Sequence, residues 1–419
     1  MDSPKIRFKG YTDAWEQRKL GEMLSLLKDG THGTHADVAD GPLLLSAKNI
    51  KNGTIIWDES DRRISQEEYE KIHSKFCLKD GDILLTIVGS IGETAILKGA
   101  KNITFQRSVA FLRPNKNITS EFLYTKIQTP TFQKDLESRK STSAQPGIYL
   151  GDLAEIPVKY SSSIEEQIKI GEYFLKIDHL ITLHQRKCEQ TKKLKKFMLQ
   201  KMFPKDGANV PEIRFSGFTD AWEQRKLGEM CSLITKQTGF DYSATIKPSL
   251  VKSKDENTYS FIQNKDFGGM NINLDTDFYI PVDVAKKYPK ITLDQPSLLI
   301  SISGKIGNVG LYSLNKKAFI GGAVGICKLN NLEDGKTALY ELLSPTGQKY
   351  FESLVKASSH ANITVEDIRN IVVHIPKNEE EKKKINNYFE RLDNLITLHQ
   401  RKYEELQKIK KFMLQNLFV

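Results

Sequence analysis

The chain is poor in cysteine. Four cysteines occur in 419 residues, at Cys77, Cys188, Cys231 and Cys327, and no two of them form a CxxC pair. This scarcity indicates neither a zinc site nor a disulfide framework. No stretch approaches the roughly 18 apolar residues of a membrane span, and the segment after Met1 lacks a signal-peptide core. We therefore expect a cytoplasmic protein with no membrane partner.

Catalytic signatures are lacking too. The sequence contains no GxxxxGK[ST] loop, no GxGxxG after a strand, and no Asn-Pro-Pro or Asp-Pro-Pro motif of the kind that amino-methyltransferases carry. Its eight histidines show no metal-ligand spacing such as HExxH. The sequence therefore predicts no catalytic residue and no metal site in this chain.

Positive charge is abundant. The chain has 62 Lys and Arg against 52 Asp and Glu, a formal net charge of +10, and its apolar fraction of 39% is typical of folded domains. Such an excess favours a polyanionic partner, nucleic acid first, although ordinary solubility explains it equally well.

The most informative feature is an internal repeat. TDAWEQRKLGEM at 12–23 returns letter for letter at 219–230, an offset of 207. ITLHQRK at 181–187 returns at 396–402 and KKFMLQ at 195–200 returns at 410–415, both at an offset of 215. The chain therefore consists of two homologous halves with nearly identical ends.

The middles of the two halves keep a common skeleton but change most of their letters. DILLTIVGSIGETAIL (82–97) falls on SLLISISGKIGNVGLY (297–312) at the offset of 215, with glycines in register. These β-rich runs predict hairpins, whereas 120–139 and 337–355 predict helices. Each middle is thus expected to be a mixed α/β domain.

The repeated ends predict two long helices. Ser163-x-x-Glu166 and Asn378-x-x-Glu381 have the form of capping boxes. Apolar residues then recur at helical spacing, at Ile170, Phe174, Ile177, Ile181, Leu194 and Met198, and at Ile385, Phe389, Leu392, Ile396, Leu406, Ile409 and Met413. At about 1.5 Å per residue, some 36 residues span roughly 54 Å. We expect these helices to pack as an antiparallel coiled coil.

These elements give an α+β architecture with a pseudo-two-fold tandem of two domains and two long helices. The predicted boundaries are 1–162 for the first variable domain with its opening segment, 163–202 for the central helix, 203–212 for a Pro/Gly linker, 213–377 for the second variable domain, and 378–419 for the C-terminal helix.

This order of segments resembles the specificity (S) subunit of type I restriction–modification systems. DILLTIVGSIG and SLLISISGKIG look like the inner element of its target-recognition domains, and SAQPGIYLGDLAEIPV looks like their closing element. The second half departs from the closing element, because Ala361 stands where the first half has Pro146. The resemblance covers nearly the whole chain.

The resemblance implies a non-catalytic subunit that recognises a bipartite site on double-stranded DNA, with one domain for each half-site. It implies two methyltransferase (M) subunits and further restriction (R) subunits as partners. S-adenosylmethionine, ATP and magnesium would belong to those partners, and no cofactor is expected in this chain. Divergent middles between fixed ends suit two readers of different base sequences on one scaffold.

Side chains able to contact bases or phosphates cluster at the turns of the shared skeleton. The DNA-binding candidates are Lys48, Asn49, Lys51, Ser90, Gln106, Arg107 and Gln145 in the first half, and Asn264, Lys265, Ser303, Lys305, His360, Asn362 and Thr364 in the second. A turn residue bonded to backbone, or a solvated charge, is the alternative for each.

Partner contacts are expected from the repeated ends. The candidates are Trp15, His184, Trp222 and His399, with packing inside the protein as the alternative role. Two other functions stay open from the sequence: a structural adaptor with two protein-binding domains, and a self-contained DNA-modifying enzyme. The adaptor would show no salt-dependent affinity for DNA, whereas a reader that neutralises phosphates would lose affinity steeply with salt.

Overall fold

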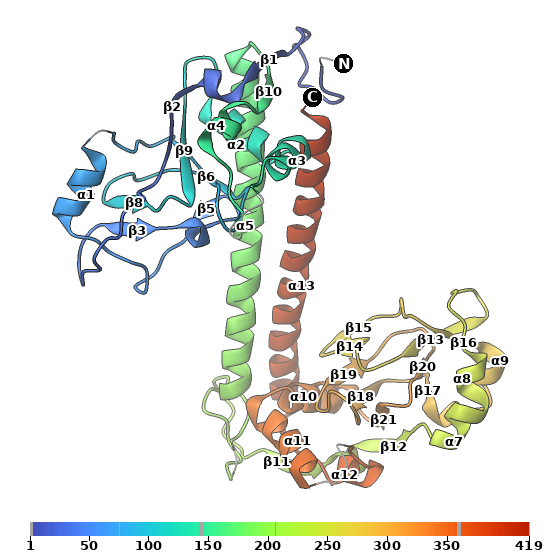
Figure 1. The fold of residues 1–419 in the computed structure, drawn as a ribbon. Coiled ribbons are helices and arrows are strands. Elements are labelled where there is room, and N and C mark those ends of the chain that lie inside the picture. Colours follow the sequence, from blue (N-terminus) through green and yellow to red (C-terminus); the bar gives the residue numbers. More distant parts are fainter. Residues whose placement is uncertain (1–2, 75, 142–145, 206, 358–361, 419) are drawn as a thin grey trace. The chain divides into compact units, whose positions relative to one another are not determined.

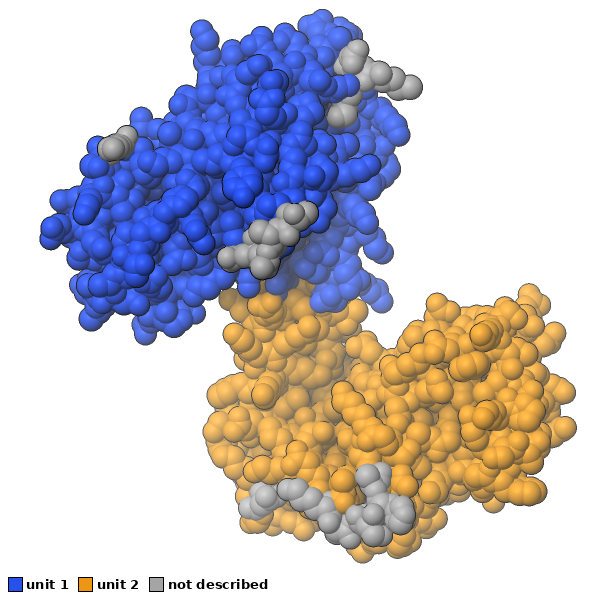
Figure 2. Space-filling model, viewed as in Figure 1, with its two compact units in different colours: residues 1–185, 400–419 blue, residues 186–399 orange. Residues whose placement is uncertain are grey.

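A computed structural model describes residues 3–74, 76–141, 146–205, 207–357 and 362–418. The chain forms two compact units, which consist of residues 1–185 with 400–419 (unit 1) and residues 186–399 (unit 2) (Figure 2). Each unit combines one variable middle with part of each of the two long helices. The mixed α+β composition expected from the sequence is present in both units.

The two long helices are α5 (Ile164–Lys201) and α13 (Glu379–Asn416), each of 38 residues (Figure 1). Ser163 caps the first, because its Oγ accepts the N–H of Glu166 at 3.3 Å. Asn378 caps the second through the N–H of Glu381, also at 3.3 Å. Among the described residues, no helix has the length and apolar character needed to cross a membrane.

The two glutamates of the predicted capping boxes have a different partner from the one expected. The Glu166 carboxylate accepts two hydrogen bonds from Arg7, at 2.7 Å from Nε and 2.9 Å from Nη2. Glu381 accepts the same pair from Arg214, at 2.6 and 2.8 Å. Both carboxylates are buried, at 0% and 1% exposure. A bidentate pair of this kind fixes the relative orientation of the two side chains and pairs their charges. It therefore holds each opening segment against the start of a long helix.

Each opening segment also contacts the end of a long helix. The N–H of Ile6 donates to the carbonyl of Asn416 at 2.9 Å, and the N–H of Ile213 donates to the carbonyl of Lys201 at the same distance. In unit 1 the Trp15 and Phe418 rings lie 5.9 Å apart. In unit 2, Phe203 and Trp222 repeat this edge-to-face contact at 5.9 Å. The last residues of the chain thus complete the unit that the first residues begin.

A Tyr–Asp–Lys group joins both long helices to the middle of each unit. In unit 1, Tyr124 donates to Asp178 at 3.0 Å and Lys410 pairs with the same carboxylate at 2.5 Å. Burial, and then the charge of Asp178, raise the pKa of the Tyr124 phenol, which keeps it a donor.

In unit 2, Tyr340 donates to Asp393 at 3.2 Å and Lys195 pairs with Asp393 at 2.5 Å. The Cys188 Sγ lies 3.9 Å from the carbonyl of Ile396. From Cys188 to Lys195 the residue number rises along α5, while that of the contacted residue falls along α13, from Ile396 to Asp393. The helices therefore run antiparallel within unit 2.

Unit 1 is built on a four-stranded antiparallel sheet (Figure 1). Its strands, in spatial order, are β2 (Leu24–Asp29), β9 (Val109–Pro114), β6 (Ile83–Thr86) and β7 (Thr94–Ile96). Smaller pairs are β1 (Glu16–Lys19) with β10 (Pro157–Tyr160), parallel β3 (Leu43–Leu45) with β8 (Ile103–Phe105), and β4 (Ile50–Lys51) with β5 (Thr54–Ile55).

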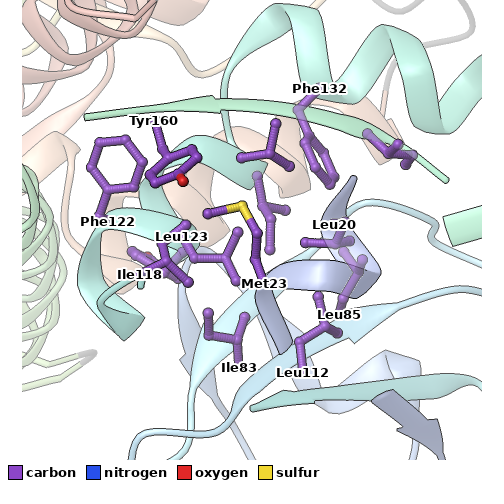
Figure 3. Close-up of a cluster of buried hydrophobic side chains, with 14 of the residues drawn as sticks. Leu20, Met23, Ile83, Leu85, Leu112, Ile118, Phe122, Leu123, Phe132 and Tyr160 are labelled. Atoms are coloured by element: carbon purple, nitrogen blue, oxygen red, sulfur yellow. The ribbon is translucent and has the colours of Figure 1, made fainter. Parts of the chain in front are cut away.

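Short helices complete unit 1. They are η1 (Leu20–Met23), η2 (Ala47–Asn49), α1 (Gln66–His73), α2 (Ser120–Ile127), α3 (Pro130–Ser138) and α4 (Leu150–Ala154). Leu20 and Met23 of the repeated opening segment point into the core between the sheet and α2 (Figure 3). Their neighbours there include Ile83, Leu85, Leu112, Ile118, Phe122, Leu123, Phe132 and Tyr160.

Unit 2 repeats the main sheet with β12 (Cys231–Lys236), β21 (Val324–Leu329), β18 (Ser297–Ser301) and β19 (Val309–Tyr312). A second sheet contains β16 (Tyr279–Pro281), β13 (Thr258–Ile262), β20 (Ala318–Ile320) and β17 (Thr292–Leu293). Two further pairs are β11 (Glu223–Lys226) with β22 (Val372–Ile375), and β14 (Phe267–Gly268) with β15 (Asn271–Ile272).

The helices of unit 2 are mostly short. They are α6 (Leu227–Met230), α7 (Gly239–Asp241), the π-helical η3 (Tyr242–Ile246), α8 (Lys247–Ser249), α9 (Val282–Ala285), η4 (Pro289–Ile291), α10 (Leu332–Leu342), α11 (Pro345–Ala357) and α12 (Val365–Arg369).

The common skeleton of the two middles is confirmed in its strand register. Ile83 pairs with Leu112 across β6 and β9, and the residues 215 further along, Leu298 and Cys327, pair across β18 and β21. The predicted hairpins β6–β7 and β18–β19 are present.

Two further details of the prediction were wrong. The helices expected at 120–139 and 337–355 are each divided in two, because Pro130 and Pro345 begin new helices. A proline disfavours helical backbone in the residue before it and begins a helix readily. Leu194 and Ile409, expected in the packing stripe, are 45% and 39% exposed. The buried face of α5 at this level instead contains Cys188 and Leu199.

Arg7→Met should destabilise the protein strongly, because it leaves the Glu166 carboxylate buried without a charge partner. We expect a loss of about 3–5 kcal/mol in the free energy of unfolding. Arg18→Met is the matched control, since the Arg18–Glu16 pair is about half exposed and should cost less than about 1 kcal/mol. Equal losses in denaturant unfolding of the two variants would contradict this role.

Lys126 should make stability depend on pH in the alkaline range. Burial lowers the pKa of its amine to about 8 in the folded chain. Between that value and its ordinary pKa of about 10.5 the unfolded chain holds a proton that the folded chain has released, so stability rises with pH. Lys126→Met should remove this rise, as measured by unfolding at pH 7.5 and 10 of both proteins. An identical pH dependence in the two would show that the amine titrates normally.

Candidate nucleic-acid interface

Unit 1 has a cleft at one end of its main sheet, which we call cleft 1. It forms where β2 ends, where the chain leaves β6 and β8, and where it approaches α4. Its volume is about 320 Å³, and its lining consists of Asp29, His32, Ile87, Val88, Arg107, Ser141, Gly147, Ile148, Tyr149 and Leu150.

Unit 2 has a cleft in the equivalent place, which we call cleft 2. Its volume is about 470 Å³, and its lining consists of Lys236, Gln237, Thr238, Gly239, Ile302, Ser303, Gly322, Asn362 and Ile363. Asp29 and Lys236 are equivalent at the offset of 207, and Arg107 and Gly322 at the offset of 215. The two clefts are therefore counterparts in the repeat.

The backbone frame of the two clefts is the same. The N–H of Ile148 donates to the carbonyl of Ile87 at 2.9 Å, and the N–H of Ile363 donates to that of Ile302 at 2.9 Å. Isolated bridges join Val88 to Gly147 and Ser303 to Asn362. Both closing segments, although they differ in sequence, thus add to the end of the main sheet in one way.

A buried hydroxyl fixes the loop beside each cleft. Thr86 Oγ1 accepts the N–H of Glu93 at 2.9 Å, and Ser301 Oγ accepts the N–H of Asn308 at 3.0 Å. Gly89, Gly92, Gly304 and Gly307 in these loops all have positive φ. Turn geometry therefore accounts for the repeated glycines.

The polar lining differs between the clefts at almost every equivalent position. Asp29 of cleft 1 is acidic, whereas its counterpart Lys236 is basic. The counterparts of His32 and Arg107 are both glycines. Conversely, two positions without a polar side chain in cleft 1, Val88 and Gly147, correspond to the polar Ser303 and Asn362 of cleft 2. In a DNA groove, carboxylates accept from cytosine, Arg and Lys donate to guanine, and Asn or Gln pairs with adenine. One frame thus presents two different sets of donors and acceptors.

Asp29 of cleft 1 has a side-chain partner within the cleft. His32 Nε2 lies 2.6 Å from Asp29 Oδ2, and the His32 side chain is 64% exposed. Arg107 is exposed, and its backbone N–H donates to the carbonyl of Thr31 at 3.0 Å. The backbone is therefore held while the guanidinium is accessible to a ligand.

Three of the DNA-binding candidates line the clefts, namely Arg107, Ser303 and Asn362. Ser90 and Lys305 are exposed in the loops beside them. The Asn264 side chain donates to the Ser303 carbonyl at 2.8 Å and so supports cleft 2. Contact of any of these residues with DNA remains a prediction.

Other candidates already have partners within the protein. Asn49 is 3% exposed, and its side chain bonds to Ser46, Ile56 and Asp61. Lys48 pairs with Asp61 at 2.8 Å, and this bond, together with that from Asn49, lowers the pKa of the Asp61 carboxyl to about 2.

The remaining candidates are more scattered. Lys51 is exposed on β4, Gln106 is half-buried and bridges to Thr31, Lys265 pairs with Asp277, and Thr364 caps α12 through the N–H of Asp367. Gln145 and His360 lie outside the described residues.

The partner-binding candidates differ in accessibility. Trp15 and Trp222 are only 5% and 3% exposed and pack inside their units, so a direct contact would require the core to open. His184 and His399 are half-buried on the long helices. Sequence reasoning missed Asp29 and Lys236, which end the equivalent strands β2 and β12, and Gln237, which follows Lys236.

The protein is a member of a known DNA-specificity family. The family described as "Type I restriction modification DNA specificity domain" matches residues 12–193 and 219–408, one match in each half. The chain therefore belongs to this family.

Individual relatives agree with this membership. The chain is 26% identical over 412 residues to the type I restriction enzyme MjaVIII specificity subunit of Methanocaldococcus jannaschii, which covers 95% of this chain and 90% of that one. It is 31% identical over 162 residues to the EcoBI specificity subunit of Escherichia coli, covering 37% of this chain and 33% of that one.

Among solved structures, the S subunit of a type I restriction–modification system from M. genitalium has the same fold. The TM-score is 0.68 at 15% identity, over 100% of this chain and 99% of that one.

Proposed function

We propose that this chain is the non-catalytic DNA-specificity subunit of a type I restriction–modification complex, and that each unit reads one half of a bipartite duplex site. The observation that carries the proposal is the pair of equivalent clefts. They share a backbone frame and differ in their polar side chains, as two readers of different base sequences would.

In this proposal the two long helices set the distance between the half-sites that the two clefts read. At about 1.5 Å per residue, a helix of 38 residues is roughly 57 Å long. Half-sites one turn of duplex apart lie about 34 Å from centre to centre. An antiparallel coiled coil of α5 and α13 would hold the clefts at one separation, whereas a flexible linker would allow many.

The repeated ends bind the partner subunits. Exposed apolar residues recur at equivalent positions of the two long helices, with Leu180, Ile409 and Phe412 in unit 1 and Leu395, Leu194 and Phe197 in unit 2. Each unit thus offers one copy of the same apolar surface, which suits two copies of one methyltransferase subunit. The S-adenosylmethionine, ATP and magnesium of the complex belong to the partners, which include the restriction subunits.

Site selection from random duplexes tests the reading function, with the chain in complex with its methyltransferase subunits. We expect a bipartite site with a gap of constant length, and an affinity that falls steeply with salt. Arg107→Ala should relax one half-site only and cost about 1–3 kcal/mol at the base it reads. Asn362→Ala is the corresponding variant in cleft 2 and should relax the other half-site only.

Three results would contradict these proposals. Selection of no bipartite site would exclude the reading function and favour a structural adaptor. A gap of variable length between the half-sites would exclude the role of the long helices in setting that distance. Methyl transfer or cleavage by the purified chain alone would show a self-contained enzyme.

The apolar surfaces predict the stoichiometry of the complex. Phe412→Ala and Phe197→Ala should each remove one methyltransferase subunit, and the double variant both, because each ring belongs to a separate copy of the surface. Gln407→Ala and Lys192→Ala are controls, at exposed positions on another face of the same helices. The mass of the assembled complex is the measurement, and full assembly of the double variant would refute the assignment.

A further inference from the structure

Two aromatic rings are unusually exposed. Phe240 is 81% exposed and Tyr149 is 69% exposed, the two highest values among the large apolar side chains that the structure describes. The next is Phe412, at 55%. Tyr149 lines cleft 1. Phe240 does not line cleft 2 itself but is next in the sequence to Gly239, which does. One of the two most exposed rings therefore lines cleft 1, and the other belongs to the residue next to the lining of cleft 2.

The repeat does not explain this coincidence, because the rings stand at different positions of it. The counterpart of Tyr149 at the offset of 215 is Thr364, and the counterpart of Phe240 at the offset of 207 is Gly33. Tyr149 comes from the closing segment before α4, whereas Phe240 comes from the segment after β12. The two exposed rings thus come from different segments of the repeat, one beside each cleft in the sequence.

The backbone beneath each ring is fixed. The carbonyl of Tyr149 accepts the N–H of Leu153 at 2.9 Å in the first turn of α4. Phe240 lies in α7, which Thr238 caps by accepting the N–H of Asp241 at 3.1 Å. A ring on a fixed backbone presents its face with little loss of conformational freedom on binding.

The surroundings of the rings indicate what they contact. Asp29, His32 and Arg107 share cleft 1 with Tyr149, and Lys236 and Gln237, which precede Phe240 in the sequence, line cleft 2. A flat ring among charged and amide side chains suits a nucleobase, whose face stacks while its edge and phosphate bond to polar groups. A protein partner would require a wider apolar patch.

From these observations we infer that Tyr149 and Phe240 stack on bases of the DNA, one ring at each half-site. This inference rests on the proposed function. Methylation of a base requires that the base leave the helical stack, so bases in such a complex become accessible to a stacking side chain. Each ring would stack in the gap that the departing base leaves between its neighbours, beside the bases whose edges the cleft reads.

Fluorescence of 2-aminopurine, placed in turn at each position of the two half-sites, tests the inference in the complex with the methyltransferase subunits. Tyr149→Ala and Phe240→Ala should each weaken DNA binding about tenfold and change the fluorescence in one half-site only. The slope of affinity against salt should not change, because the rings neutralise no phosphate.

Variants that keep a ring are the matched controls. Tyr149→Phe and Phe240→Tyr should bind DNA within about twofold of the wild type, because either ring can stack. Both side chains are exposed, so the midpoint of thermal unfolding should be unchanged in all four variants.

The outcomes separate this inference from the proposed function. If the wild-type complex selects no bipartite site, the proposed function itself fails. If it selects one and both alanine variants retain wild-type affinity and fluorescence, only the stacking inference is overturned. Equal losses in the ring-keeping variants, or weaker binding of methyltransferase subunits without DNA, would also overturn it, the latter in favour of a protein contact.

Discussion

The architecture depends on a buried ion pair that occurs twice. Glu166 and Glu381 lie in the first turns of the long helices, in surroundings that exclude water, so each carboxylate requires a cation that remains charged there. Arg7 and Arg214 supply it through two parallel hydrogen bonds. Because these arginines belong to the opening segments, the pair sets where each variable middle starts relative to its helix.

Much of the fold could be predicted from the sequence, because the repeat compares the chain with itself. Equivalent letters at offsets of 207 and 215 located the shared strands, and helical spacing located α5 and α13. Contacts distant along the chain were beyond such reasoning. Glu166 was expected to bond its own cap, whereas its partner lies 159 residues away. Local periodicity also placed Leu194 in a packing stripe, although the buried face follows Cys188 and Leu199.

The candidate site was predicted less completely. Residue type and position at a turn indicated Arg107, Ser303 and Asn362, which line the clefts. The same criteria indicated Asn49, whose amide is occupied by Ser46, Ile56 and Asp61. A sequence shows which side chains can bond but not which have already done so. Tyr149 and Phe240 escaped attention because their positions in the repeat differ, and only their shared exposure beside the clefts connects them.

The closure of unit 1 by residues 416–418 has a consequence for stability. Asn416 and Phe418 complete the unit that contains Ile6 and Trp15, whereas unit 2 receives the equivalent contacts from Lys201 and Phe203 in mid-chain. Removal of residues 416–418 would therefore destabilise unit 1 and leave the equivalent contacts of unit 2 in place. Circular permutation at the 203–212 connection would transfer that vulnerability to the other domain.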